Sequence, residues 1–382
     1  MVYFSVPEPH RPLVDRLNAF IKDELLPLEQ ECGVDEDAGI PVELRKRVAA
    51  RSYALGFYTL GVPAAYGGME LGQVGLTAVR EEIARSGSAF ARFILGGGAG
   101  LLRGCNEAQR QAYLLPVIRG EKYSCFAMTE PRGGSEARSI LTTAVRQGDH
   151  FALNGTKSFV THGPYADFAV VVAQAKAEDG QDLGITLFLV DRETRGYRLG
   201  RIWNTMAGGN EDCELIFENC VVPAANVLGQ VGKGLPEGLG YLSGGRLSFG
   251  ALSVGTARLA LDLTVQHARA PHPSGKPLAA REGVQLRLGE MLTQIYAARS
   301  MTYDVAALAD EGRDIRTEAA MVKLFSTEMV GQVVDAALQL HGSAAYVRGH
   351  PIERLYRVVR GWRLAEGASE IQKYTIAGGL LA

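Results

Sequence analysis

The sequence predicts an α+β fold in which a β domain lies between two helical domains. Apolar residues follow helical spacing through most of 1–121 and 234–382, whereas 122–233 contains short strand-like runs separated by Gly, Asp and Pro. A chain of 382 residues is long enough for two or three domains. We therefore expect an N-terminal helical domain over 1–121, a middle antiparallel β domain over 122–233 and a C-terminal four-helix bundle over 234–382.

The N-terminal domain begins with a strongly periodic segment. Its apolar residues recur at helical spacing, at Leu13, Leu17, Phe20, Ile21 and Leu25. Pro27 should kink or end this first helix, because proline lacks the amide hydrogen that a helix interior needs. A further amphipathic helix is expected over 108–118, and Gly120 fits its C-terminal stop.

The middle domain is predicted from its strand-like texture. Two strands are expected within 150–175, with a turn at Asn154–Gly155, because Asn-Gly is a strong hairpin signal. Further strands are expected at 185–190 and 214–217.

Three long helices are expected in the C-terminal domain. Apolar residues at helical spacing mark one helix around 249–263, a second over 286–308 and a third over 321–340. The third is apolar around more than half of its circumference. Such a helix is typical of the interior of a bundle or of a subunit interface.

Composition excludes several classes of protein. The net charge is −2 without a long basic stripe, which argues against nucleic acid as the main partner. No apolar run reaches the length of a membrane span, and the N-terminus lacks a signal-peptide pattern, so a cytoplasmic protein is expected. The five cysteines include no CxxC pair, so neither a metal site nor a disulfide framework is indicated. The phosphate-binding GxGxxG and GxxxxGK[ST] patterns and the hydrolytic HExxH and GxSxG patterns are also missing.

Four separate motifs, in a helix–β–helix order, resemble those of the acyl-CoA dehydrogenase family. The first is AMTEPRGGSE at 127–136, and the second is LNGTKSFVTHG at 153–163. The third is ELIFENCVVP at 214–223, and the fourth runs over 339–372 and ends in EGASEIQ. Any one motif alone is weak evidence, but the four together cover nearly the whole chain. The resemblance implies an enzyme that binds FAD between the β domain and the C-terminal helices.

The resemblance also implies which residues contact the cofactor. These are Phe126, Met128, Thr129, Gly134, Ser135, Phe159, Thr161 and Gln339. Aromatic and methionine side chains suit the face of a flat ring, while threonine hydroxyls suit its polar edge. Ser135 would also contact the acyl thioester, and Arg246 matches an arginine of the family near the substrate.

Glu366 matches the catalytic base of the family. It lies between two small residues, Ala365 and Gly367, and chemistry next to a thioester carbonyl needs a precisely held carboxylate. Some members carry their base directly before the arginine of an early C-terminal helix. Here Gly245 precedes Arg246, so that position offers no carboxylate.

Several positions depart from the family pattern, including Arg132, Ser243 and Ser274, and three more bear on whether FAD is tightly bound. Pro271 replaces an arginine that reaches the FAD pyrophosphate of a neighbouring subunit, Ser343 replaces a glycine, and Ala368 replaces a threonine. Loss of a bidentate arginine–phosphate contact weakens cofactor binding. These departures keep open whether FAD is tightly bound.

The leading hypothesis is FAD-dependent α,β-dehydrogenation of an acyl thioester carried on CoA or on an acyl-carrier protein, with Glu366 removing the α-proton. The resemblance implies an electron-transfer flavoprotein or a similar acceptor, and a homotetramer or homodimer. Two alternatives stay open: a non-redox acid/base enzyme of the same fold acting on a thioester, and a flavin monooxygenase of this fold, which would not need Glu366.

Overall fold

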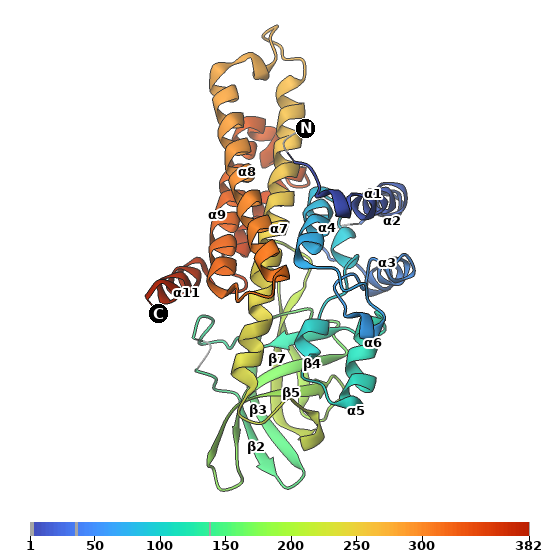
Figure 1. Ribbon diagram of the computed structural model, residues 1–382, viewed down its shortest axis with the longest axis vertical. Coiled ribbons are helices and arrows are strands. Elements are labelled where there is room, and N and C mark those ends of the chain that lie inside the picture. The colour runs from blue at the N-terminus through green and yellow to red at the C-terminus, as the bar shows by residue number, and fades with distance from the viewer. Residues whose placement is uncertain (1–3, 35–36, 137–138, 382) are drawn as a thin grey trace. The chain divides into compact units, whose positions relative to one another are not determined.

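The computed structural model describes residues 4–34, 37–136 and 139–381, apart from the side chains of 242 and 243 (Figure 1). The chain forms two compact units. The first, here called the helical unit, comprises the residues up to 33, residues 71–92 and the residues from 243 onward. The second, here called the sheet unit, comprises 34–70 and 93–242.

The sheet unit is built on one sheet whose strand order is β6-β7-β3-β2-β4-β5-β8, with β1 paired to β4. The pairings β1–β4 and β2–β4 are parallel, and the others are antiparallel, so the expected antiparallel sheet contains two parallel pairings. The strands are β1 (Ser124–Ala127), β2 (Thr143–Gln147), β3 (His150–Thr161), β4 (Phe168–Lys176), β5 (Asp182–Asp191), β6 (Tyr197–Trp203), β7 (Asp212–Pro223) and β8 (Val227–Leu228).

The turn predicted at Asn154–Gly155 is wrong, because β3 continues through both residues. The pairing of β3 with β7 instead shifts register between Leu153 and Gly155, which is a bulge rather than a reversal of the chain. Gly155 has φ +150°, and a Cβ atom there would lie 2.6 Å from Oγ1 of Thr142. Glycine is therefore required by close backbone approach, and Asn154 uses its side-chain oxygen to accept a hydrogen bond from the Asn219 amide at 2.8 Å.

Strand β4 is buried on both faces, which explains its nearly continuous apolar sequence. Val171 and Ala173 belong to one core, together with residues of β3, β5 and β7. Val170 and Val172 belong to a second core, which includes Tyr113 and other residues of the helical segments of this unit. Those segments are α3 (Val42–Ala54), η3 (Ala64–Tyr66), η5 (Ala99–Leu102), α5 (Glu107–Gln109), η6 (Arg110–Leu114), α6 (Leu115–Ile118) and η7 (Ala224–Asn226).

The helical unit contains the three long helices that the sequence predicts. These are α7 (Gly234–Arg269), which enters this unit from the sheet unit, α8 (Glu282–Asp310) and α9 (Arg316–His341). Helix α9 packs against α8, α10 (Pro351–Trp362) and α11 (Ser369–Leu381). The remaining segments are η1 (Glu8–His10), α1 (Arg11–Phe20), η2 (Ile21–Leu25), α2 (Leu26–Cys32), α4 (Gln73–Arg85), η8 (Leu278–Ala280) and η9 (Gly342–Tyr346), while η4 (Ala91–Phe93) lies where the chain passes between the units.

Pro27 does not end the first helix, contrary to one of the two outcomes predicted. The helical path runs from α1 through η2 into α2, and η2 is a single π-helical turn directly before the proline. A wider turn relieves the clash of the proline ring with the preceding turn and leaves no amide unpaired at Pro27. The same arrangement recurs in the sheet unit, where the π turn η6 precedes Pro116.

Buried charges connect α4, α7 and α8 within the helical unit. Glu81 of α4 is 1% exposed and bonds to Arg258 of α7. It also accepts hydrogen bonds from Arg299 at 2.9 Å and from the Tyr303 hydroxyl at 2.8 Å, both on α8. A buried carboxylate needs such partners, so these bonds fix how the three helices pack.

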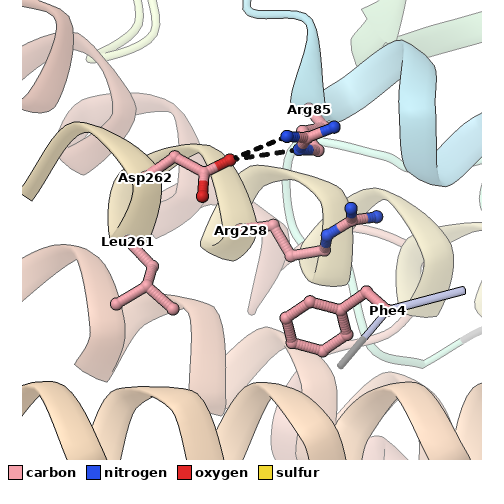
Figure 2. A pocket seen from close by; sticks show the side chains of 5 residues that line it. All are labelled: Phe4, Arg85, Arg258, Leu261 and Asp262. Carbon is pink, nitrogen blue, oxygen red and sulfur yellow. Dashed lines mark hydrogen bonds and ion pairs between the residues drawn. The ribbon is translucent and has the colours of Figure 1, made fainter. Parts of the chain in front are cut away.

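A small pocket lies beside this cluster (Figure 2). Arg85 of α4 bonds to Asp262 of α7 at 3.0 Å, and the Arg258 guanidinium lies over the Phe4 ring at 4.9 Å from its centroid. Leu261 completes the lining. Both arginines have carboxylate partners, so the pocket is part of the packing between α4 and α7.

Within the described residues, no helix combines the length and the apolar character needed to cross a membrane.

Candidate active site

Glu366 lies in the turn between α10 and α11, in a backbone conformation that is rare for its residue type. Its φ is +53°, and Gly367, which follows it, has φ +89°. A left-handed conformation costs a non-glycine residue roughly 1–2 kcal/mol, so the surrounding structure must hold it in place. A strained residue at this position is consistent with a functional role for the side chain.

Two buried side chains hold the backbone of this turn. Lys323 of α9 donates from Nζ to the Gly367 carbonyl at 2.9 Å and to the Arg363 carbonyl at 3.3 Å. Gln372 of α11 donates from Nε2 to the carbonyls of Glu366 at 2.9 Å and Gly367 at 2.8 Å. Both side chains are 0% exposed, so these bonds form away from water and are strong restraints.

The carboxyl group of Glu366 is partly withdrawn from solvent. Its Oε2 atom is buried and has no hydrogen-bond partner among the residues that the structure describes. Burial raises the pKa of Glu366 to about 7, while the positive charges of Arg246 and Lys323 oppose this rise. A carboxyl group with a pKa near neutrality can both accept and return a proton.

Gly245 and Arg246 of α7 lie beside the Glu366 side chain. A Cβ atom on Gly245 would be 2.9 Å from Cδ and from Oε2 of Glu366, so glycine leaves room for the carboxyl group. Arg246 is 8% exposed, and its Nε is buried without a hydrogen-bond partner in the described part of the chain. Burial lowers the pKa of Arg246, and the Glu366 charge opposes this shift.

In the sheet unit, the first two motifs are brought together by buried polar groups. Lys157 of β3 is 0% exposed, and it donates to Glu130 at 2.7 Å and to the Met128 carbonyl at 3.1 Å. The Ser158 amide donates to the Thr129 carbonyl at 2.9 Å. The loop after β1 is therefore fixed against β3, with Met128 and Thr129 at a defined place.

Phe159 and Thr161, at the end of β3, have different surroundings. Phe159 has φ +52° and is 58% exposed, and its ring stacks on Trp203 of β6 at a centroid distance of 5.0 Å. The Thr161 hydroxyl donates to Asp212 at 2.6 Å, and burial raises the pKa of that carboxyl group. An exposed, pre-stacked aromatic ring beside a hydroxyl can receive a flat ligand with a polar edge.

The other predicted cofactor residues are more dispersed. Phe126 of β1 meets the Tyr241 ring edge-on at 5.6 Å, while Gly134 and Ser135 are exposed in the loop that follows β1. Gln339 is exposed in the last turn of α9. It lies 16 residues beyond Lys323, or roughly 24 Å along the helix axis. The chain therefore does not bring Gln339 to the Glu366 turn.

Sequence reasoning missed Lys323, Lys157 and Trp203. Lys323 lies between Val322 and Leu324 in a mostly apolar stretch of α9, and a charge in such a stretch is a signal of a buried functional or structural group. Lys157 lies within the LNGTKSFVTHG motif, but its pairing with Glu130 cannot be predicted without knowing the register of the sheet. Trp203 lies outside the four motifs and gives no signal of its own.

Comparison with known proteins supports the predicted family. The family models described as the acyl-CoA dehydrogenase N-terminal, middle and C-terminal domains match residues 7–121, 125–220 and 232–381. A 3-(aryl)acrylate reductase of Clostridium sporogenes is 35% identical over 380 residues, which cover 98% of this chain and 99% of that protein. The mitochondrial short-chain specific acyl-CoA dehydrogenase of Homo sapiens is 34% identical over 388 residues, which cover 100% of this chain and 92% of that protein.

A solved structure gives the same result for the fold. An acyl-CoA dehydrogenase from Bacillus anthracis, complexed with FAD, superposes with a TM-score of 0.86 at 29% sequence identity. The match covers 99% of this chain and 67% of that chain. These findings confirm the predicted fold and the predicted class, a flavin-dependent oxidoreductase. The chain belongs to the acyl-CoA dehydrogenase family.

Proposed function

We propose that this protein is an FAD-dependent oxidoreductase that introduces or reduces the α,β double bond of an acyl-CoA thioester. The observation that carries the proposal is the Glu366 carboxyl group, which is held in a strained turn and has a pKa raised to about 7 by burial. Relatives named as a dehydrogenase and as a reductase support chemistry at this bond in either direction.

Glu366 acts as the acid/base group at the α-carbon. In the oxidative direction its carboxylate removes the α-proton, and in the reductive direction its carboxylic acid returns a proton to the same carbon. FAD, when bound, supplies the acceptor or donor of the hydride at the β-carbon. Because the pKa of Glu366 is near 7, both protonation states are present at neutral pH.

The residues of the sheet unit fit a flavin ring. Phe159 presents an exposed ring that is already stacked on Trp203, and the Thr161 hydroxyl lies on the same strand. A Cβ atom on Gly133 would meet nothing within 4 Å, and one on Gly134 would meet the Thr129 side chain at 3.9 Å, so the loop after β1 is uncrowded at these glycines. We assign Phe126, Met128, Thr129, Gly134, Ser135, Phe159, Thr161 and Gln339 to cofactor binding, and Ser135 and Arg246 to the thioester.

The three departures from the family pattern bear on how tightly FAD is held. Pro271 lies in the exposed loop after α7 and carries no side-chain nitrogen, so it offers no hydrogen bond to a phosphate. Ser343 is also exposed, in η9. Ala368 lies two residues after Glu366 and lacks the hydroxyl that the family pattern places there. We expect weaker FAD retention during purification than in family members that carry the arginine.

We also propose a homo-oligomer, a tetramer or a dimer, that exchanges electrons with an electron-transfer flavoprotein or a similar carrier. Large apolar side chains are exposed on four helices of the helical unit, which supports contact with further copies. They include Leu286 and Tyr296 on α8, Phe325 on α9, Tyr356 on α10 and Tyr374 on α11.

Flavin absorbance provides the test. The purified protein is loaded with FAD and mixed anaerobically with saturated acyl-CoA thioesters, and the reduced protein is mixed with the corresponding enoyl-CoA thioesters. We expect bleaching in the first case and recovery of absorbance in the second. Glu366→Gln should bind FAD but slow both changes by about 10²–10⁴-fold, because it removes the acid/base group.

The matched control is Glu290→Gln, which makes the same change at an exposed position on α8 and should leave both rates unchanged. If the saturated thioester bleaches the flavin of Glu366→Gln at the wild-type rate, the role of Glu366 is refuted. Failure of every thioester to bleach the FAD-loaded protein would refute the proposed reaction.

A further inference from the structure

Lys323 is a buried lysine whose hydrogen-bond partners among the described residues are backbone carbonyls rather than carboxylates. It lies on the buried side of α9, is 0% exposed, and donates to the carbonyls of Gly367 and Arg363. Burying an ammonium group is costly unless it gains compensating interactions. Two carbonyl acceptors and the nearby carboxylates of Glu328, Glu366 and Glu370 offset that cost.

We propose that Lys323 is the positioning residue of Glu366, because it anchors the strained turn through the Gly367 carbonyl and places a positive charge beside the Glu366 carboxylate. This inference rests on the proposed function, in which Glu366 is the acid/base group. In this inference, the Lys323 side chain both holds Glu366 in position and contributes part of the charge around its carboxyl group.

The geometric part follows from the hydrogen bonds of the turn. Gly367 directly follows Glu366, and its carbonyl accepts from Lys323 at 2.9 Å and from Gln372 at 2.8 Å. Ser369, at the start of α11, donates to Glu328 of α9 at 2.7 Å. The turn is thus held from α9 and α11. Of the two side chains that donate to the Gly367 carbonyl within the described residues, Lys323 is charged and Gln372 is neutral.

The electrostatic part involves all the charges that face this pair. Arg246 of α7 and Lys323 both lower the pKa of Glu366 against the effect of burial. Burial lowers the pKa of Lys323 to about 8, Glu328, Glu366 and Glu370 oppose this, and Arg246 adds to it. Arg316 acts on Arg246 in turn. At neutral pH Lys323 is therefore mainly protonated, and its removal should raise the pKa of Glu366 further.

Gln372 allows the geometric and the electrostatic roles of Lys323 to be tested separately, because it bonds to the same turn but carries no charge. Its Nε2 donates to the carbonyls of Glu366 and Gly367. Gln372→Leu should therefore disturb the position of Glu366 while leaving the charges around it unchanged. Lys323→Met removes both the bonds and the charge, and Lys323→Arg keeps the charge.

The experiment follows proton removal without the redox step. Acetyl-CoA has α-hydrogens but no β-carbon, so exchange of its α-hydrogens in D2O, followed by mass spectrometry, reports on the base alone. The FAD-loaded protein is assayed across pH 5.5–9.5 together with kcat/KM for the acyl-CoA thioester that bleaches it best. Circular dichroism and bound flavin absorbance confirm that each variant is folded.

We expect Lys323→Met to slow α-hydrogen exchange at pH 7 by about tenfold or more. The exchange rate rises with pH as Glu366 loses its proton, and in this variant the rise should occur about one pH unit or more higher. Lys323→Arg should lower the rate with little change in the pH range of this rise, and Gln372→Leu should do the same. If Lys323→Met exchanges at the wild-type rate and its rate rises over the wild-type pH range, the inference is overturned. If Lys323→Met does not fold, Lys323→Gln, which keeps a neutral donor, should show the same shift of the rise to higher pH, and no shift would overturn the inference.

The outcomes also separate this inference from the proposed function. If exchange depends on Glu366 but not on Lys323, only the positioning role fails. If wild-type protein and Glu366→Gln exchange acetyl-CoA equally slowly and no thioester bleaches the flavin, the proposed function itself fails.

Discussion

Gly245 of α7 lies directly against the carboxyl group of Glu366, close enough that a Cβ atom on the glycine would be 2.9 Å from Cδ of the glutamate. The two residues are 121 positions apart in the sequence and meet only because α7 passes the turn between α10 and α11. The absence of a side chain at one position is thus a condition for the placement of the side chain at the other.

The first prediction concerns this contact. Gly245→Ala should displace the Glu366 carboxyl group and lower kcat by about tenfold or more, since small misplacement of a catalytic group is costly. Thermal stability should change little, because alanine favours the helix while the new methyl group crowds the glutamate. The control is Gly244→Ala, where a Cβ atom meets nothing within 4 Å. Equal kcat values in the two variants would show that the contact is irrelevant to catalysis.

The second prediction concerns the pH dependence of the two reaction directions. Oxidation requires the Glu366 carboxylate, so kcat/KM for the saturated thioester should rise with pH through about 7. Reduction requires the carboxylic acid, so kcat/KM for the enoyl thioester should fall through the same region. Steady-state rates measured in both directions between pH 5.5 and 9 test this. Parallel profiles in the two directions would exclude Glu366 as the group that titrates.

The third prediction concerns the buried Lys157–Glu130 pair, whose side chains are 0% and 6% exposed. Lys157→Met leaves Glu130 charged and buried, and it should lower the free energy of unfolding by about 3–5 kcal/mol. The double variant Lys157→Met/Glu130→Gln should recover part of that loss, because the amide carries no charge. Denaturant unfolding measures both.

An exposed ion pair in the same sheet provides the control for this prediction. Arg198 and Glu218 pair at 3.0 Å with side chains 55% and 64% exposed. Arg198→Met should cost less than about 1 kcal/mol. If Lys157→Met and Arg198→Met lower the free energy of unfolding equally, burial does not determine the strength of the Lys157–Glu130 pair.

The fourth prediction concerns His341, at the end of α9. Its ring stacks on His267 at 4.3 Å and meets His350 at 5.3 Å, and its Nε2 is buried without a partner among the described residues. Burial, together with these two histidines, lowers the pKa of His341 to about 4. In the unfolded chain the ordinary pKa is about 6.5, so unfolding takes up a proton between these values and stability falls as pH decreases from 6.5 to 4.

Replacement of His341 by Gln should therefore flatten the decline of the melting temperature between pH 6.5 and 4. The half-buried His272, in the loop after α7, supplies the control, and His272→Gln should leave that decline unchanged. An identical decline in wild-type protein and His341→Gln would show that another group causes the acid sensitivity.

Local pattern was sufficient to predict the helices and the family of this chain. Helical spacing around 249–263 predicted α7, although the apolar residues that the helix buries there are Ala251, Val254, Ala257, Ala260 and Leu261. Glu366 was predicted from its motif, and the structure adds the reason for its raised pKa. The assignment of Phe159 and Thr161 to a cofactor stays a prediction.

Other features depended on contacts between distant segments, which local pattern does not contain. The Asn154–Gly155 dipeptide has the composition of a hairpin turn, but pairing with β7 and the closeness of Thr142 make it a bulge. The apolar neighbours of Lys323 signal burial, but its partners cannot be named until the turn after α10 is known to lie against α9. Pro27 reads as a helix stop, but a wider turn before it keeps the helix intact.

The helical unit is built from three separate segments of the chain, and this determines the order in which the two units can fold during synthesis. Its first two segments end at residue 92, yet its third begins only at residue 243, so the N-terminal helices leave the ribosome long before their partners exist. Glu81 of α4 must wait for the guanidinium groups of Arg258 and Arg299. The sheet unit, complete at residue 242, is free to form first. A nascent chain of this protein therefore carries apolar helices without their partners, and a carboxylate without its guanidinium groups, for more than a third of its translation.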